Sequence, residues 1–487
     1  MIFVTLIGHD FQYEIQHLLK AFYPQETIEF TVEKNKALDS IQIYSIWRDN
    51  GFRGEVHVDQ QVYQQEHQED LSGYEDTERG KVAKRLLKKV LYEALELYTK
   101  RSLPWGILTG IRPTKIVHEL LEKGFSNEEI EKELSIKYHI QQEKIALMKK
   151  VARKEKQILD QNQPEEISLY IGIPFCPTRC VYCSFTSYPI GQWKDHIDAY
   201  TKALITEIKA FEPIYHRHPI RSIYIGGGTP TSLSAFQLQI LLEAMNEFLP
   251  MKRIEEFTIE AGRPDTITLE KLQMMKAYGV ERISINPQTM NNETLQKIGR
   301  NHTVEDIIQA FQMAKEVGFD CINMDLIVGL PGETLHHVQH TWEQLEGLKP
   351  DTITVHTMAI KRASKLRRNL EQYELIGEEE IEKILFFTQE QTQKMGLEPY
   401  YLYRQKNMIG NLENIGYCIP GKECIYNVEI MEEKQTIMSF GAGAVTKVVD
   451  VPKNHIQRIE NVKDVSHYIQ RIEEMIQRKK RVLTIDE

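Results

Sequence analysis

Three cysteines gather within eight residues in the segment IPFCPTRCVYCSF (173–185), where Cys176, Cys180 and Cys183 form a C-x3-C-x2-C motif. Iron–sulfur clusters take thiolate ligands, and three thiolates can hold three irons of a four-iron cubane. The fourth iron then has no protein ligand and stays open. A structural zinc site would need a fourth ligand, and the next candidate, His196, falls on the following expected helix. The spacing therefore predicts a [4Fe–4S] cluster with one open iron.

A glycine-rich segment, IYIGGGTPT (223–231), follows the next expected strand. Glycines let the backbone approach a ligand closely, although they also make ordinary tight turns. Its backbone groups could hold the amino-acid end of S-adenosylmethionine (SAM), whose amino and carboxylate groups can chelate an open iron. Electron transfer from the cluster would then cleave the sulfonium and leave a 5′-deoxyadenosyl radical. In such a site the cofactors supply the chemistry, while the protein positions and shields them.

Polar residues follow several later strands, namely Glu260 in FTIEAG, Gln288 in SINPQT, Arg300 in GRNH and Asp325 in NMDLIVGLPGE. Asp325 stands in an apolar run, where an unpaired carboxylate is costly to bury. Arg300 or a ligand hydroxyl could satisfy it. Each residue alone fits a salt bridge as well as a ligand contact, but together they favour a binding site on one rim.

The other three cysteines are scattered. Cys321 lies in an expected strand and fits a small buried hydrophobic residue. Cys418 and Cys424 could join a second metal site, but the sequence gives them no compact ligand set.

These motifs fall in a region where strands and helices alternate. Six strands are expected, and alternation of this kind implies parallel βαβ units. Six units favour a partial (β/α)6 barrel over a full eight-unit one, with the chemistry at the carboxyl ends of the strands. The expected strands are 168–173, 221–227, 257–262, 280–286, 319–328 and 351–360. The expected helices are 193–211, 235–249, 268–278, 304–317 and 335–348.

Different patterns flank this region. Residues 1–160 read as an α+β domain, with strands at 1–8, 28–34, 41–48 and 55–59 and an amphipathic helix over 81–100. A polar stretch at 157–166 is a plausible linker. We therefore predict an α/β chain with an extra N-terminal α+β domain (1–160), a partial barrel (166–400) and a C-terminal domain (401–487).

The bulk composition narrows the classes of function. The 487 residues carry 60 Lys and Arg against 70 Asp and Glu, a net charge of −10. This balance disfavours nucleic-acid partners, because phosphate contacts need a local cationic surplus. The N-terminus lacks the pattern of a signal peptide, and no apolar run is long enough to span a membrane. We expect a cytoplasmic protein with reduced thiols.

The motifs resemble, in their order, those of the oxygen-independent coproporphyrinogen III oxidase family of radical SAM proteins. The resemblance covers residues 168–360 through YIGIPFCPTRCVYC, IGGGTPT, the strand ending at Glu260, RISINPQT, GRNH and DLIVGLPGE. NLENIGY (411–417) and SFGAGAVT (439–446) continue it weakly. PWGILTGIRPTK (104–115) and the extra N-terminal domain resemble the HemZ-type branch, coproporphyrinogen dehydrogenase HemZ.

The resemblance implies a set of cofactor contacts but no catalytic residue. The implied metal ligands are Cys176, Cys180 and Cys183, and the implied SAM contacts are Tyr170, Tyr182, Gly227, Gly228, Thr229, Glu260, Gln288, Arg300, Asp325, Ala359 and Val445. The sequence departs from the family pattern in three places: Gly172 stands in place of a frequent His, Phe185 in place of the fourth Cys of the decarboxylases, and the pair Asn286-Pro287 in place of Gly-Val. These departures leave the substrate open.

The resemblance implies oxidative decarboxylation of coproporphyrinogen III to protoporphyrinogen IX in heme biosynthesis, with an unidentified electron donor and acceptor. Two alternatives stay open: a heme-binding or heme-transfer protein, and another radical SAM reaction. A tetrapyrrole needs cations for its propionates and apolar or aromatic walls. Arg112, Arg362, Arg404 and the stretch 399–404 are candidates for that role, although surface charge and ordinary packing explain them equally well.

Overall fold

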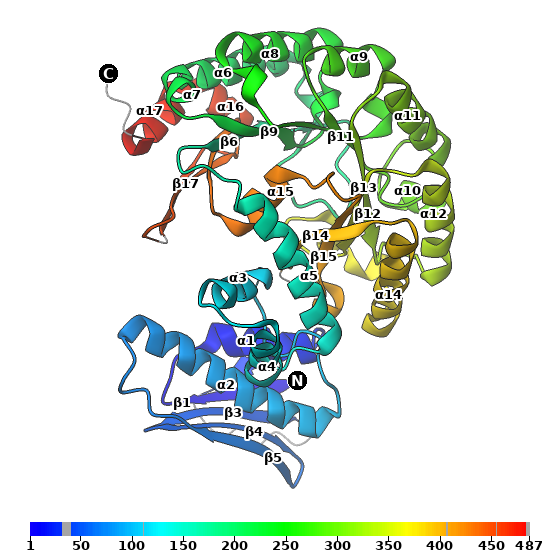
Figure 1. The fold of residues 1–487 in the computed structure, drawn as a ribbon. Helices are drawn as coiled ribbons and strands as arrows, with labels where there is room; N and C mark the ends of the chain where they lie inside the picture. Colours follow the sequence, from blue (N-terminus) through cyan, green and yellow to red (C-terminus); the bar gives the residue numbers. More distant parts are fainter. Residues whose placement is uncertain (32–39, 111, 406–407, 454, 484–487) are drawn as a thin grey trace. The chain divides into compact units, whose positions relative to one another are not determined.

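The computed structural model describes residues 1–31, 40–110, 112–405, 408–453 and 455–483. The chain forms two compact units, Met1–Lys150 and Val151–Glu487 (Figure 1). The three domains expected from the sequence stay a prediction.

The first unit contains a five-stranded sheet in the order β2-β1-β3-β4-β5. Strand β1 runs parallel to β2 and β3, and β3, β4 and β5 form antiparallel hairpins. The expected strand 28–34 is represented by β2, and its residues 32–34 lie outside the described residues. Strand β5 was not predicted, because its sequence QVYQQEHQ is almost wholly polar. The strands are β1 (Ile2–Ile7), β2 (Ile28–Phe30), β3 (Ile41–Arg48), β4 (Gly51–Val58) and β5 (Gln61–Gln68).

Helices α1 (Gln12–Phe22) and α2 (Asp76–Thr99) supply most of the remaining core of the first unit. Gly54 of β4 permits close packing of α2, because a Cβ there would lie 2.6 Å from the Leu91 Cα. The unit continues through α3 (Thr114–Glu122) and α4 (Asn127–Tyr138), and α5 (Gln142–Leu159) leads into the second unit. Residue 111, within the segment 104–115, lies outside the described residues.

The second unit confirms the α/β prediction. Its eleven-stranded sheet contains six adjacent parallel strands in the order β6-β9-β10-β11-β12-β13. Each matches one of the six strands expected from the sequence. They are β6 (Ile167–Ile173), β9 (Ile220–Gly227), β10 (Glu256–Gly262), β11 (Arg282–Ile285), β12 (Cys321–Val328) and β13 (Thr352–Thr357).

Helices connect these strands and line the outer side of the sheet (Figure 1). Two of them begin where a capping box satisfies free backbone amides, with Ser234 and Gln237 at α8 and Thr303 and Asp306 at α11. Helix α11 ends at Gly318, which adopts the left-handed conformation that favours glycine. The connecting helices are α6 (Ile197–Lys209), α7 (Glu212–Arg217), α8 (Ala235–Phe248), α9 (Leu269–Ala277), α10 (Asn292–Lys297), α11 (Val304–Val317) and α12 (Leu335–Leu348).

The last part of the chain adds strands to both edges of the same sheet. Strand β16 pairs in parallel with β6, and β15 pairs antiparallel with β13. Beyond them lie β17 and β18 at one edge and β14 at the other. The added strands are β14 (Glu398–Tyr403), β15 (Asn414–Cys418), β16 (Thr436–Phe440), β17 (Val445–Asp450) and β18 (His455–Glu460). The helices of this part are α13 (Lys365–Arg368), α14 (Glu378–Lys394), α15 (Ile425–Glu432), α16 (Val465–Gln470) and α17 (Ile472–Leu483).

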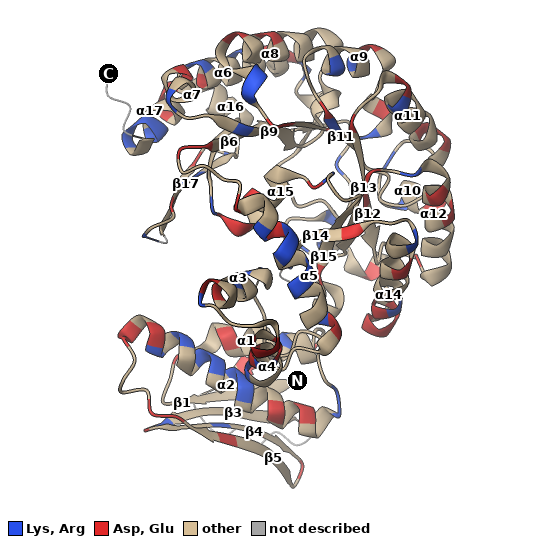
Figure 2. Cartoon of the chain, viewed as in Figure 1, with Lys and Arg blue, Asp and Glu red and all other residues tan. Residues whose placement is uncertain are grey.

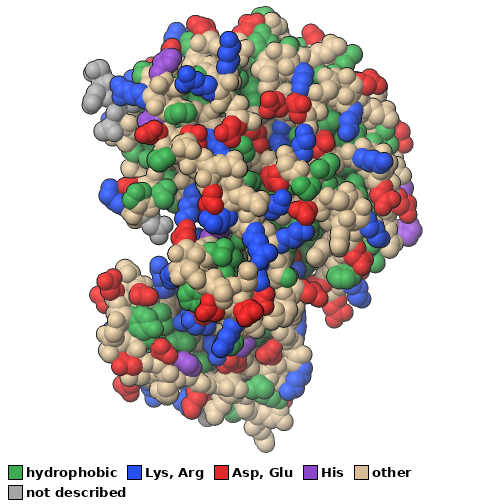
Figure 3. Space-filling view, in the orientation of Figure 1, with side chains coloured by type: hydrophobic (Ala, Val, Ile, Leu, Met, Phe, Trp, Pro, Cys, Tyr) green, Lys and Arg blue, Asp and Glu red, His purple; other side chains and the backbone are tan. Residues whose placement is uncertain are grey.

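Charged residues are concentrated on the helices of the second unit, and its strands consist mostly of uncharged residues (Figure 2). Acidic and basic side chains alternate over the face shown in Figure 3, without a broad area of one sign. None of the described helices combines the length and the apolar character that crossing a bilayer requires.

Candidate functional site

A cavity of about 510 Å3 opens at the carboxyl ends of the six parallel strands. This is the edge at which barrel-like α/β folds place their chemistry. Its lining includes twelve of the fourteen site residues named from the sequence. These are Cys176, Cys180, Tyr182, Cys183, Gly227, Gly228, Thr229, Glu260, Gln288, Arg300, Asp325 and Ala359.

The three cysteines lie on the loop that follows β6. The loop begins with the short strand β7 (Phe175–Cys176), which pairs with β8 (Tyr188–Pro189). A turn closed by the Cys183 amide and the Cys180 carbonyl, 3.2 Å apart, brings the last two cysteines near each other. Within the described residues, the three thiols do not form a group tight enough for a single ion.

Two arginines dominate the electrostatics of Cys180. Burial opposes ionisation, but the Arg300 and Arg263 guanidinium groups hold the pKa of the Cys180 thiol below its usual value. Burial instead raises the pKa of Cys176 to about 11, and it also raises the pKa of Cys183. Metal binding requires deprotonated thiols. Because burial disfavours the thiolate form of Cys176 and Cys183, a bound metal cation would have to stabilise their negative charge.

The glycine loop after β9 packs directly on the cysteine loop. The amides of Gly228 and Thr229 donate to the carbonyls of Ile173 and Phe175 at 2.8 and 2.7 Å. A Cβ on Gly228 would lie 2.6 Å from the Phe175 carbonyl oxygen, so this approach requires glycine. Both amides are engaged by the neighbouring backbone, so a ligand at this loop would contact carbonyl groups and the Thr229 hydroxyl. That hydroxyl donates to the Cys176 sulfur at 3.5 Å.

Glu260 stands one strand further on, near the end of β10. Its carboxylate accepts a 2.5 Å hydrogen bond from the Tyr224 hydroxyl and another from the Gly227 amide. Burial raises the pKa of Glu260 to about 7, and the nearby Asp325 carboxylate adds to the effect. No Lys or Arg among the described residues forms an ion pair with Glu260. Its carboxylate is therefore placed to receive a cationic or hydroxyl-bearing ligand.

Gln288 adopts a left-handed backbone conformation, with φ at 69°, which is uncommon for a residue other than glycine. Its backbone bridges β12 through hydrogen bonds to Asp325 and Ile327. The buried side-chain oxygens of Gln288 and Asn286, and the Nε of Arg300, have no hydrogen-bond partner within the described part of the chain. Buried polar atoms without partners in the cavity wall indicate a ligand site, because leaving such atoms unpaired is energetically costly.

Asp325 does not pair with Arg300. It accepts from the Asn323 amide at 2.8 Å, and its Oδ2 lies 3.8 Å from the His356 Nε2. Arg300 instead donates to the Asn286 carbonyl and, at 3.3 Å, to the Tyr182 hydroxyl. Burial raises the pKa of Asp325. His356 and the hydrogen bonds that Asp325 accepts outweigh this effect, so the pKa of Asp325 is lowered overall. Asp325 thus presents a carboxylate with a lowered pKa in the cavity wall.

Two residues implied by the resemblance, Tyr170 and Val445, are absent from the cavity lining. Tyr170 on β6 stacks against Tyr224 and Tyr426, with ring centres 6.4 and 6.0 Å away. Val445 begins β17, directly after the loop 441–444. Tyr170 therefore lies behind Tyr224, which does line the cavity.

Sequence reasoning missed much of the cavity wall. Arg263, Arg282, His356 and Lys361 line the cavity, although the sequence assigned none of them a role. The sequence contains one pattern that could have identified the residues of the cavity wall. On the inner strands, polar or tyrosine residues recur at every second position, whereas a parallel strand buried on both faces is usually apolar throughout. The alternating inner residues are Tyr224 of β9, Thr258 and Glu260 of β10, Arg282 and Ser284 of β11, Asn323 and Asp325 of β12, and Thr354 and His356 of β13.

Some of the sequence candidates have structural roles instead. Arg404 is buried and donates to the carbonyls of Asn411 and Leu412, so it braces a loop. Arg362 is exposed and does not line the cavity. Cys424 lines the cavity with its thiol 3.3 Å from the Glu256 carboxylate, whereas Cys418 is buried among apolar side chains. Within the described residues these two cysteines join no metal-binding group.

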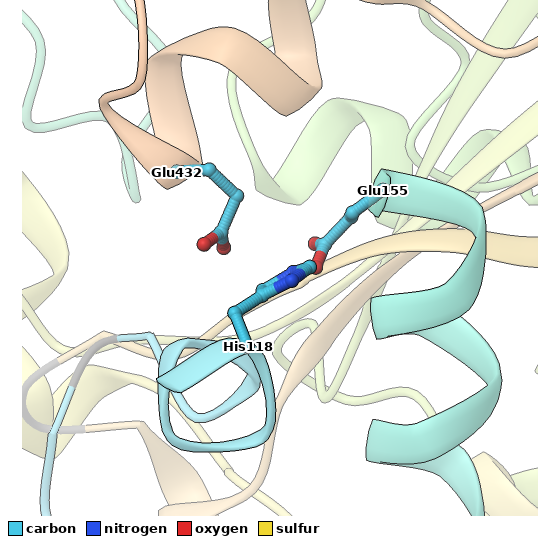
Figure 4. A group of neighbouring side chains, drawn as sticks. All are labelled: His118, Glu155 and Glu432. Atoms are coloured by element: carbon cyan, nitrogen blue, oxygen red, sulfur yellow. The ribbon is translucent and has the colours of Figure 1, made fainter. Parts of the chain in front are cut away.

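Two buried acidic side chains that do not line the cavity lie close to each other. The carboxylates of Glu155 on α5 and Glu432 at the end of α15 are buried within 4.8 Å of each other (Figure 4). Neither residue lines the cavity.

Comparison with known proteins gives consistent matches. The radical SAM superfamily model matches residues 170–345. The oxygen-independent coproporphyrinogen-III oxidase-like protein HemZ of Bacillus subtilis is 43% identical over 403 residues, which cover 82% of this chain and 80% of HemZ. The heme chaperone HemW of the same organism is 32% identical over 310 residues, which cover 63% of this chain and 76% of HemW.

A solved structure agrees in fold. Coproporphyrinogen III oxidase (HemN) from Escherichia coli, described as a radical SAM enzyme, superposes with a TM-score of 0.54 at 24% identity, over 67% of this chain and 73% of HemN. The identity and coverage of HemZ and the matched superfamily domain show that this chain belongs to the radical SAM family of coproporphyrinogen III oxidase-like proteins that includes HemN, HemZ and HemW.

Proposed function

We propose that this protein is a radical SAM oxidoreductase that decarboxylates coproporphyrinogen III to protoporphyrinogen IX. The observation that carries the proposal is that one cavity joins three cysteine thiols to a wall of unsatisfied polar groups and tyrosines. The family implies a [4Fe–4S] cluster and SAM, and the residues fit both. When bound, they would supply a 5′-deoxyadenosyl radical.

The cluster would be held by Cys176, Cys180 and Cys183. Glu260 and Asp325 offer carboxylates to the amino group and the ribose hydroxyls of SAM, and Gln288 and Arg300 offer their unpaired polar atoms. The other implied contacts, Tyr170, Tyr182, Gly227, Gly228, Thr229, Ala359 and Val445, would position these groups or shape the space around them. Together they would orient SAM and exclude water from the reacting atoms.

A tetrapyrrole would find both polar and aromatic surfaces in the same cavity. Arg179, Arg282 and Lys361 bring positive charge to the lining, and Tyr400, Tyr401 and Tyr403 bring aromatic walls. Carboxylates such as propionates are bound by charge-assisted hydrogen bonds to groups of this kind. In the proposed reaction, each of two propionates would lose a β-hydrogen atom to the 5′-deoxyadenosyl radical, which becomes 5′-deoxyadenosine. CO2 would then depart, one electron would pass to an acceptor, and a vinyl group would remain.

One observation favours a second function, heme binding and transfer. Phe185 stands where the decarboxylases carry a further Cys, and its ring is 69% exposed beside the cluster cysteines. HemW, which is called a heme chaperone, is also similar to this chain. A flat apolar ring could rest on such an exposed aromatic side chain.

The test is an anaerobic turnover assay on the reconstituted protein, with SAM, a reductant, coproporphyrinogen III and an electron acceptor. The Cys180→Ala variant serves as the matched control without a complete ligand set. Chromatography would follow protoporphyrinogen and 5′-deoxyadenosine, and heme-stained electrophoresis would follow heme binding.

Protoporphyrinogen and deoxyadenosine formed together, and absent from the Cys180→Ala variant, are the expected result. Deoxyadenosine without a tetrapyrrole product would reject this substrate and keep the radical chemistry. Heme binding without either product would support heme transfer.

A further inference from the structure

A buried arginine, which the motifs leave unassigned, lies against the cysteine loop. Strand β10 has an irregular register between Glu260 and Gly262, and Gly262 adopts a φ of 62°. This bend turns the chain so that Arg263 follows the strand with its side chain only 3% exposed. A buried guanidinium is rare unless it is paired, so its surroundings define its role.

The two edges of the Arg263 guanidinium have different partners. Its Nε and Nη2 donate to the two carboxylate oxygens of Asp265 at 2.9 and 2.8 Å. Its Nη1 donates to the Thr178 hydroxyl at 3.0 Å and lies 3.9 Å from the Cys180 sulfur. The arginine therefore presents an N–H group and a positive charge to a candidate cluster ligand and keeps its counter-charge on the far side.

These partners are themselves held in place. The Thr178 hydroxyl donates to the Gly299 carbonyl at 2.9 Å, which ties the cysteine loop to the segment before Arg300. The Asp265 carboxylate also lies 3.5 Å from the buried His302 Nδ1. A forked pair of hydrogen bonds fixes the plane of the guanidinium, which a single lysine ammonium could not reproduce.

We propose that Arg263 sets the reduction potential of the cluster, as a positioning residue that acts through the Cys180 sulfur. The inference rests on the proposed function, since it requires a [4Fe–4S] cluster on the three cysteines. Reduction adds one negative charge to the cluster. A fixed positive charge and an N–H donor at a ligand sulfur stabilise that added charge, and hydrogen bonds to the sulfurs are a recognised determinant of cluster potential.

The Arg263–Asp265 pair makes the direction of the effect testable. Arg263→Met removes the positive charge and should make the potential more negative. Asp265→Asn keeps an oxygen acceptor for Arg263 but removes the opposing negative charge, so it should make the potential more positive. A purely structural role would not shift the two variants in opposite directions. Arg263→Lys retains the charge without the forked hydrogen bonds, and Arg217→Met removes an exposed arginine at the end of α7.

The experiment is a redox titration of each reconstituted protein, followed by electron paramagnetic resonance, with iron and sulfide measured per chain. For Arg263→Met we expect the equilibrium constant of one-electron reduction to fall about tenfold, a shift of about −59 mV. We expect a positive shift for Asp265→Asn, a smaller negative shift for Arg263→Lys, and the wild-type potential for Arg217→Met.

An unchanged potential in Arg263→Met at full iron content would overturn the proposal, as would shifts of the same sign in Arg263→Met and Asp265→Asn. If Arg263→Met assembles no cluster, an unshifted potential in Asp265→Asn overturns it instead. A wild-type chain that takes up no iron and sulfide would contradict the proposed function itself, a failure distinct from that of Arg263.

Discussion

Replacing Glu260 by Gln should stabilise the folded apoprotein while weakening SAM binding. Burial raises the pKa of Glu260 to about 7, from an ordinary value of 4.5. Between pH 4.5 and about pH 7, the folded state therefore keeps a proton on Glu260 that the unfolded state has lost. The free energy of unfolding of the wild type consequently falls as the pH rises through this range. A difference of about 2.5 between the two pKa values corresponds to about 3 kcal/mol. This is an upper bound, because part of the side chain faces the cavity.

The assay is urea unfolding of the cluster-free wild-type and Glu260→Gln proteins at pH 5 and pH 8, under reducing conditions. The advantage of the variant in free energy of unfolding should grow by about 2 kcal/mol between the two pH values, since the glutamine carries no ionisable group. Glu346→Gln, on the exposed side of α12, controls for the loss of one negative charge. An advantage that is the same at both pH values would refute the assignment of a destabilising buried carboxylate to Glu260.

Three further predictions follow from other parts of the second unit. Cys180→Ala should lose most of the bound iron and all SAM cleavage, because two thiolates cannot hold the cubane; iron analysis and a deoxyadenosine assay check this. Asp325→Ala should weaken SAM binding about tenfold or more with near-normal iron content, as measured by equilibrium dialysis, and unchanged affinity would contradict its role. Glu207→Ala should destabilise the fold by about 3–5 kcal/mol, because it leaves the fully buried Lys479 without its carboxylate. Thermal unfolding should show partial recovery when Lys479→Met is added, and no recovery would count against that cause.

The arrangement of the second unit could be predicted from the sequence because its signals are local. Patterns typical of helices and of short apolar strands alternate along this part of the chain. Once strands alternate with helices, the carboxyl ends of parallel strands must share one edge. The cysteine, glycine and acidic motifs all follow strands, so their meeting in one cavity followed from order along the chain.

Side-chain partners could not be predicted in the same way, because they depend on the register between strands. Asp325 and Arg300 were plausible partners by charge, yet Asp325 accepts from Asn323 on its own strand and lies near His356 on the next. The position of Arg263 beside Cys180 could not be predicted either, since it depends on a bend at the end of β10. Strand β5 escaped prediction because its side chains are polar on both faces.

Each inner strand of the second unit has one face towards the helices and one face towards the cavity, and the two faces carry different kinds of residue. Towards the helices, residues such as Ile225, Ile259 and Ile283 are fully buried and supply the apolar core. Towards the cavity, the alternate positions carry groups whose burial is unfavourable, and Glu260 with its raised pKa is one of them. A protein that needed only stability would fill these positions with apolar side chains. That the chain keeps carboxylates and an arginine there, with several polar atoms unpaired, argues that their stabilising partners arrive with the cofactors and the substrate.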